Sequence, residues 1–455
     1  MKKQGWVVAS FTALAVYLLY AYFQPTYSYH LLDSRYDAFK YAKAYEYFKG
    51  LAIDYHLSFP FNARVLMPWL AAKLPFNDLK TDFIWLNGFF IVPTVGMLTF
   101  VWQKLQIRLS LILIALFWAL FHWKGLVRMY LPDPITADVG GYFWLTSSLT
   151  LLLVGKGKFW SDGTSDLLLL SIKTGQYDRI KQQSDYKNGK RFLIIFGFLL
   201  IAVLGTLQKE SFIAVLGVTA LWGGLSDWMV SAPTTAGETK KDAFSITKVT
   251  LLTLLSAFLI AVLTHYLVSH FFPASTSDWR NNSFISLFRG AKRYILQPEL
   301  FLRIPISWLF AYGTLWLAIL STPKLSFFTT LFSLLITHFL LWIFLSVFGG
   351  GDTTRILFNG MPFVLTFLLL RLNQQPKWIA WYILFTSLPL MRLNELEPDL
   401  GVYPQATQRW CVECWTLSES WGYWVYAIAV LAGYYYFLRR FGAILSDKTN
   451  HVNAR

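Results

Sequence analysis

Apolar runs recur along the whole chain and are separated by shorter polar segments. A helix that crosses the hydrocarbon core of a bilayer needs roughly 17–25 mostly apolar residues. Lipid offers the backbone no hydrogen-bond partners, so such runs are expected to be α-helical. We interpret twelve runs as spans, near 5–23, 83–103, 109–123, 139–154, 192–208, 211–228, 248–269, 306–321, 325–347, 356–371, 377–391 and 422–438.

The composition supports this reading. Hydrophobic residues make up 55% of the 455 positions and charged residues only 14%, whereas soluble domains carry about 25% charged residues. The first run is too long for the apolar part of a cleaved signal peptide, so we expect it to be retained as a span. The pattern predicts one all-α, polytopic membrane domain over residues 1–455.

The net charge of +15 reflects orientation in the membrane. Eight lysines and arginines lie between 156 and 191, and basic residues gather on the cytoplasmic side of spans. The loop 155–191 is therefore expected to be cytoplasmic. Twelve spans then place both termini in the cytoplasm of a bacterial inner (plasma) membrane. No basic nucleic-acid-binding motif is present, so we expect no nucleic-acid partner.

Three long loops fall on the opposite, outer side, at 24–82, 270–305 and 392–421. They hold both cysteines, Cys411 and Cys414. No second Cys or His pair lies nearby to complete a zinc site. On an oxidising outer face, a disulfide between these two cysteines is the expectation.

The first outer loop carries two carboxylates four residues apart, Asp33 and Asp37. On a helix this spacing places both on one face. Near the membrane surface they could act as a general base or hold a divalent cation such as Mg or Mn. The alternative is a solvated face paired with Arg35 or Lys40.

A short apolar stretch follows at 59–70, and its prolines predict a short helix lying in the membrane interface. Arg64 would then lie at headgroup depth, where its fork of donors could bind a lipid phosphate. Simple contact with headgroups is the alternative. The segment 281–303 also resembles an interfacial helix, with Arg289 and Arg293 on a basic face that attracts anionic lipid.

Polar residues at other span ends complete the candidate site. Asp138 is the first residue of a span, where the helix dipole stabilises a carboxylate. Lys209 and Glu210 lie between two spans; they are either functional or a mutual ion pair in a tight turn. Asp352 and Arg355 follow three glycines, which allow close backbone approach.

These features resemble the GT-C superfamily of polytopic glycosyltransferases. Many bacterial members have a Tyr-Asp…Tyr motif just after the first span and a later Pro-Phe…Arg-x-Leu-x-Pro-x-Leu segment. The matching residues here are Tyr36-Asp37…Tyr41 and Pro60-Phe61…Arg64-Val65-Leu66-Met67-Pro68-Trp69-Leu70. Asp138, the Lys209-Glu210 pair and Asp352…Arg355 are similar to such proteins as well.

The resemblance implies an inverting transferase with a GT-C-like fold. Its donor would be a sugar carried on a polyprenyl phosphate, and its acceptor a glycan, lipid or protein. Asp37 matches the base best and Asp33 second, while Arg355, Arg64 and Lys209 would stabilise the lipid phosphate. Members that bind a metal often show Asp-x-Asp or Asp-x-Glu, which this chain lacks, so no cofactor is assigned.

Two other functions fit the pattern. A transporter or flippase for a lipid-linked saccharide would explain the spans and the basic outer rim. It should also place several charged residues deep within spans, where this sequence offers mainly His265 and His338. A non-catalytic membrane assembly subunit is the second alternative.

Overall fold

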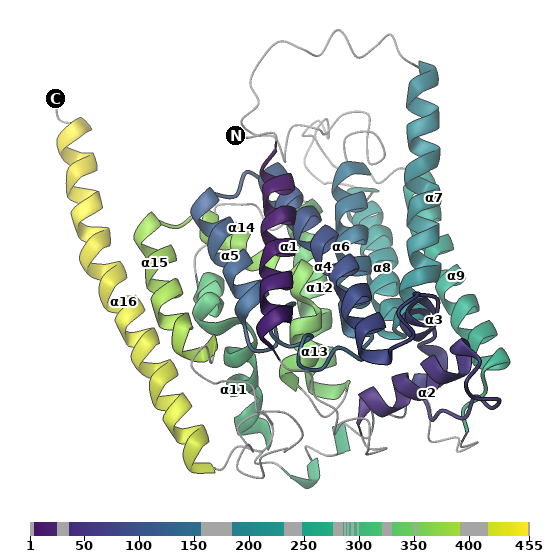
Figure 1. The fold of residues 1–455 in the computed structure, drawn as a ribbon. Helices are drawn as coiled ribbons and strands as arrows, with labels where there is room; N and C mark the ends of the chain where they lie inside the picture. Colours follow the sequence, from purple (N-terminus) through teal and green to yellow (C-terminus); the bar gives the residue numbers. More distant parts are fainter. Residues whose placement is uncertain are drawn as a thin grey trace.

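The structure is a computed structural model whose helices stand side by side (Figure 1). It describes residues 4–24, 36–155, 184–231, 248–275, 300–320, 330–349, 353–391 and 417–453, with a few positions between 285 and 297. Within these ranges every regular element is a helix, as the sequence predicts.

The chain up to residue 271 supplies most of the long helices, although the longest described helix, of 37 residues, lies at 417–453. Its elements are α1 (Gly5–Phe23), α2 (Asp37–Lys49), η2 (Phe61–Ala63), α3 (Leu66–Ala72), α4 (Leu79–Lys104), α5 (Leu109–Phe121), α6 (Asp138–Gly155), α7 (Ser184–Gln208), α8 (Ser211–Ser231) and α9 (Lys248–Phe271).

Between residues 300 and 391 the helices are shorter and more broken. The elements from residue 300 onward are α11 (Leu300–Tyr312), η5 (Gly313–Leu320), α12 (Thr330–Phe348), α13 (Thr353–Asn359), α14 (Met361–Asn373), α15 (Lys377–Ser387), η6 (Leu388–Met391) and α16 (Leu417–Asn453). Each of the twelve predicted apolar runs contains helix. Three of them cross from one element into the next: α11 into η5, α13 into α14, and α15 into η6.

Among the described residues, four helices are long and apolar enough to cross a membrane: α1, α4, α9 from Thr250, and the combined stretch Phe301–Leu320. The bent pair α13 and α14 would be a fifth. Only 17% of the apolar window of α1 and 22% of that of α9 is buried. Their outward side chains include Phe11, Leu19, Leu259 and Leu263. Such an apolar exterior suits lipid contact.

The two ends of the bundle differ. The first residues of α1, the start of α7 and the end of α16 lie at the upper end in Figure 1. The short helices α2, α3 and α13 lie at the lower end, and we call this the α2 end.

Helix α2 is fixed to the beginning of α4. The Tyr45 hydroxyl donates to Asp82 Oδ2 at 2.7 Å, and Lys49 Nζ lies 3.5 Å from the same oxygen. Lys49 also donates to the Leu74 carbonyl at 2.9 Å. Because Asp82 is fully buried, these contacts hold the C-terminal part of α2 and so orient its first residue, Asp37.

The stretch 59–70, predicted as one short helix, forms two pieces, η2 and α3. Arg64 lies between them with φ −90° and ψ 63°, outside the helical region. The break directs the Arg64 side chain to residues of α2 and of the α7–α8 turn.

Gly360 lies at the sharp break between α13 and α14, where the chain bends by 76°. Its φ of −74° is open to any residue, so the constraint here is space. A Cβ at this position would lie 2.3 Å from Cγ of the Trp342 ring. The glycine therefore lets α12 pack against the break.

We predict that Gly360→Ala lowers the free energy of unfolding by about 1–3 kcal/mol, the usual cost of overpacking a filled site. The matched control is Gly224→Ala in α8, where a Cβ meets nothing within 4 Å. It should be neutral or gain up to about 1 kcal/mol of helix propensity. Thermal unfolding in detergent measures both, and equal melting temperatures for the two variants would contradict the packing argument.

Candidate functional site

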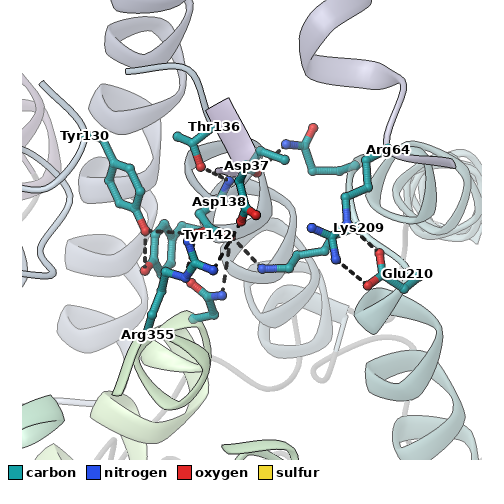
Figure 2. A network of polar contacts seen from close by, with 12 residues as sticks. Asp37, Arg64, Tyr130, Thr136, Asp138, Tyr142, Lys209, Glu210 and Arg355 are labelled. Carbon is teal, nitrogen blue, oxygen red and sulfur yellow. Dashed lines mark hydrogen bonds and ion pairs between the residues drawn. The ribbon is translucent and has the colours of Figure 1, made fainter. Parts of the chain in front are cut away.

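Six charged side chains gather at the α2 end. We call them the polar network: Asp37, Arg64, Asp138, Lys209, Glu210 and Arg355 (Figure 2). They come from α2, the η2–α3 break, the start of α6, the α7–α8 turn and α13. All six are residues that the sequence predicts for the site, and the fold brings them together across more than 300 positions of sequence.

Asp138 forms the centre of the polar network. Its Oδ1 lies 2.6 Å from Lys209 Nζ, and its backbone N–H donates to Thr136 Oγ1 at 3.1 Å. The Tyr130 hydroxyl donates to Oδ2 at 3.4 Å, and Asn359 Nδ2 lies 3.5 Å from Oδ1. As the first residue of α6, the carboxylate also faces the positive end of the helix dipole.

Electrostatics keep Asp138 charged. Burial alone would raise its pKa, but Lys209 and Arg355 outweigh burial and hold the pKa of this carboxyl below its ordinary value. Burial raises the pKa of Tyr130 well above its ordinary value, so its hydroxyl stays a donor. The centre of the site is thus an ionised carboxylate surrounded by donors.

Arg64 and Glu210 form the second pair. Arg64 Nε and Nη2 donate to Glu210 Oε2 and Oε1 at 2.8 and 2.5 Å. Arg64 Nη1 donates to the Tyr41 hydroxyl at 3.1 Å. Burial works against the charge of Glu210, yet Arg64 lowers the pKa of that carboxyl. This two-point geometry is the strongest form of ion pair that Arg makes.

Lys209 and Glu210 do not pair with each other, although they are neighbours in sequence. Each instead reaches a partner on a different element, Asp138 on α6 and Arg64 before α3. The short turn between α7 and α8 therefore ties two separate parts of the fold together. The two residues do lie in a tight turn, but the mutual ion pair considered for them is not what the structure forms.

Asp37 and Arg355 form the third and most open pair, with Arg355 Nη2 3.2 Å from Asp37 Oδ2. Their side chains are 36% and 31% exposed, against 7% for Asp138 and 19% for Lys209. Arg355 Nε also lies 3.9 Å from Asp138 Oδ2. Asp37 is the carboxylate of the polar network that outside molecules reach most easily.

A narrow pocket lies beside Asp138. Its lining residues are Asp138, Gly141, Tyr142, Leu145, Gly205, Lys209, Ser211, Phe212, Trp342 and Asn359. Only about 20 Å³ is open to the centre of a water-sized group, which is room for about one water molecule. A sugar ring is larger than this space.

Several predicted residues lie outside the described part of the chain: Asp33, Asp352, Arg289, Arg293, Cys411 and Cys414. Within the described part, no group of three or more His, Cys, Asp or Glu side chains could hold a metal ion. Asp33 would be needed to complete the predicted pair with Asp37, so the Mg or Mn site stays a prediction.

Sequence reasoning missed two contributors to the site, Tyr130 and Asn359. Tyr130 stands eight residues before Asp138, in a proline-rich segment that gives no sign of where its hydroxyl points. Asn359 closes a short helix and shows no pattern that sets it apart from other asparagines. Both contact Asp138 through tertiary packing alone.

Comparisons with protein-family models, with curated proteins and with solved structures find no match to this chain.

We predict that the pair Arg64–Glu210 shows strong coupling in a double-mutant cycle. Arg64→Met or Glu210→Met alone should cost on the order of 3 kcal/mol of unfolding free energy, because each leaves a charge in a site that is mostly shielded from water. The double variant should regain much of that loss, since both charges are then absent.

The control for this cycle is the exposed pair Lys43–Glu46, whose side chains are 50% and 36% exposed. Lys43→Met should change the free energy of unfolding by less than about 1 kcal/mol. Thermal unfolding of the purified protein measures the stability of every variant. Additive losses in the Arg64 and Glu210 double variant would show that the pair is not coupled.

Proposed function

We propose that the protein is a membrane glycosyltransferase that moves a sugar from a polyprenyl-phosphate donor to a glycan, lipid or protein acceptor at the outer membrane face. The observation that carries the proposal is the Asp37–Arg355 pair at the open side of the polar network. It offers an accessible carboxylate directly beside a cation, which are the two groups that glycosyl transfer from a lipid phosphate requires.

The proposed roles follow from chemistry. Asp37 takes the proton from the acceptor hydroxyl as this oxygen attacks the anomeric carbon. Arg355 stabilises the phosphate that departs with the lipid. The pairs Arg64–Glu210 and Asp138–Lys209 hold the surrounding elements in place, since their shorter contacts and lower exposure make them the rigid part of the site.

The proposed architecture is a GT-C-like bundle of twelve spans in the bacterial inner membrane, with both termini in the cytoplasm. It is supported by the placement of the α1 start, the α7 start and the α16 end at one end of the bundle, opposite the polar network. The end of α6 and the start of α7, which flank the basic loop 155–191 in sequence, lie at that same end. Under this topology the polar network faces outward.

The two native cysteines give a test of this topology. Both Cys411 and Cys414 fall in the proposed outer loop 392–421. We expect a membrane-impermeant thiol reagent to label them in intact cells from which any outer membrane has been removed, and only after reduction of the proposed disulfide. The matched control replaces both with serine and introduces Ser161→Cys in the basic loop, which should be labelled only after lysis. If Ser161→Cys were labelled in intact cells and the two native cysteines only after lysis, the topology would be the opposite of the one proposed.

The central prediction concerns Asp37→Asn. Purified protein should transfer labelled sugar from a polyprenyl-phosphate donor to a pool of membrane glycolipids and proteins. Asp37→Asn should lower this transfer by at least about 100-fold, because general-base catalysis contributes about 10²–10⁴ in rate. Transfer is measured with and without Mg or Mn and with a chelator, which also tests whether transfer needs a divalent cation.

The control variant is Asp54→Asn, the same chemical change at a side chain that is 74% exposed and outside the polar network. It should keep full transfer, and both variants should match the unaltered protein in abundance and melting temperature. Undiminished transfer by Asp37→Asn would refute its role as the base. If neither the unaltered protein nor the variants transferred sugar, but the protein moved a lipid-linked saccharide across vesicle membranes, the transporter would be favoured.

A further inference from the structure

The pocket beside Asp138 is lined by two side chains with an unmet hydrogen-bonding group. These groups are Oδ1 of Asn359 and Nε1 of Trp342, and neither has a hydrogen-bond partner in the described part of the chain. Asn359 is 6% exposed and Trp342 is 2% exposed, so bulk water does not reach them. Because a buried polar group without a partner is costly, two of them on one pocket indicate a bound group that meets both.

The orientation of the Asn359 amide follows from its other contact. Its Nδ2 lies 3.5 Å from Oδ1 of Asp138, and an amide nitrogen can donate to a carboxylate. Turning the amide over would place its oxygen against the carboxylate, where two acceptors repel each other. Oδ1 of Asn359 is therefore an acceptor that needs a donor, whereas the indole N–H of Trp342 is a donor that needs an acceptor.

The size and the charges of the pocket restrict what it can bind. The open space of about 20 Å³ suits one group of the size of water. The lining contains the carboxylate of Asp138 and the ammonium of Lys209, which lie 2.6 Å apart. The ammonium disfavours a cation in this space, and the carboxylate disfavours an anion. A neutral group that both donates and accepts hydrogen bonds suits all of these neighbours, and water is such a group.

Gly141 keeps this space open. It lies near the start of α6 and lines the pocket, and a Cβ at this position would meet nothing within 4 Å. Close packing against a neighbour therefore does not require glycine here. Alanine favours helices more than glycine does, but its methyl group would occupy the space that a bound water needs.

We propose that the pocket binds one ordered water molecule, which donates to Oδ1 of Asn359 and accepts from Nε1 of Trp342. Asn359 is the last residue of α13, and Trp342 belongs to α12, so the water connects these two helices beside Asp138. The end of α13 then has two attachments, one directly to Asp138 and one through the water. Helix α13 also carries Arg355, which makes the water a positioning element for that side chain. The inference does not rest on the proposed function.

A density map of the purified protein, at a resolution that shows ordered water, tests the site directly. We expect one solvent peak within about 3.2 Å of both Asn359 Oδ1 and Trp342 Nε1. Gly141→Ala should remove this peak, because the added methyl group takes its space. A map of the unaltered protein without a peak in contact with both atoms would overturn the proposal, and so would a peak too large for a single water molecule.

Thermal unfolding provides a second test. Gly141→Ala should lower the melting temperature by about 2 °C or more, because displacing the water leaves two buried polar groups unpaired. The matched control is Gly224→Ala in α8, where a Cβ also meets nothing within 4 Å but which does not line the pocket. The control should keep or raise the melting temperature through helix propensity. If Gly141→Ala were as stable as Gly224→Ala, the pocket would not need its water.

Trp342→Phe separates the water from general packing, because it removes the indole N–H. In the unaltered protein this change breaks a hydrogen bond to the water, whereas in Gly141→Ala it removes a donor that is already unpaired. Trp342→Phe should therefore lower the melting temperature less in the Gly141→Ala background, by about 2 °C. The cavity left by the smaller ring is common to both backgrounds and cancels in the double-mutant cycle. Equal losses in the two backgrounds would show that the indole nitrogen does not bind water in this pocket.

Discussion

The Asp138–Lys209 ion pair is the contact around which the α2 end of the bundle is organised. A charge that is shielded from water is stable only when it is paired and hydrogen-bonded. Asp138 meets that condition by drawing on three other elements: the α7–α8 turn through Lys209, the segment before α6 through Tyr130, and the end of α13 through Asn359. Removing it would leave Lys209 without its 2.6 Å partner in a narrow pocket.

The second constraint is how the first outer loop is fastened. Tyr45 and Lys49 both contact the buried Asp82 of α4, so α2 cannot slide along the bundle end. Arg64 then connects this loop to Glu210. These two attachments fix the C-terminal part of α2 and the segment that follows it. Asp37 lies at the other end of this helix and is partly exposed. An accessible carboxylate on a fixed helix is a suitable support for chemistry on an outside substrate.

The fold was predictable where apolar runs decide it, and less so where packing does. Because lipid forces helical structure, each predicted run contains helix. The broken elements were not visible in the sequence: the bend at Gly360 depends on the Trp342 ring, which lies 18 positions away. The residues of the polar network were predictable by type, since ionisable residues at or within the membrane boundary are costly. Their pairing was not, because sequence neighbours Lys209 and Glu210 find partners 71 and 146 positions away.

The three ion pairs of the polar network differ in length and in exposure to solvent. In a uniformly buried network, every charge would be held equally, and a change in the charge of one residue would disturb the whole arrangement. Here the two less exposed pairs, Asp138–Lys209 and Arg64–Glu210, stabilise the packing of their elements through short contacts. The third pair, Asp37–Arg355, is longer and partly solvated. Water can therefore compensate for its separation. Separating an ion pair costs least at the solvated edge of the polar network, and Asp37 with Arg355 occupies that edge.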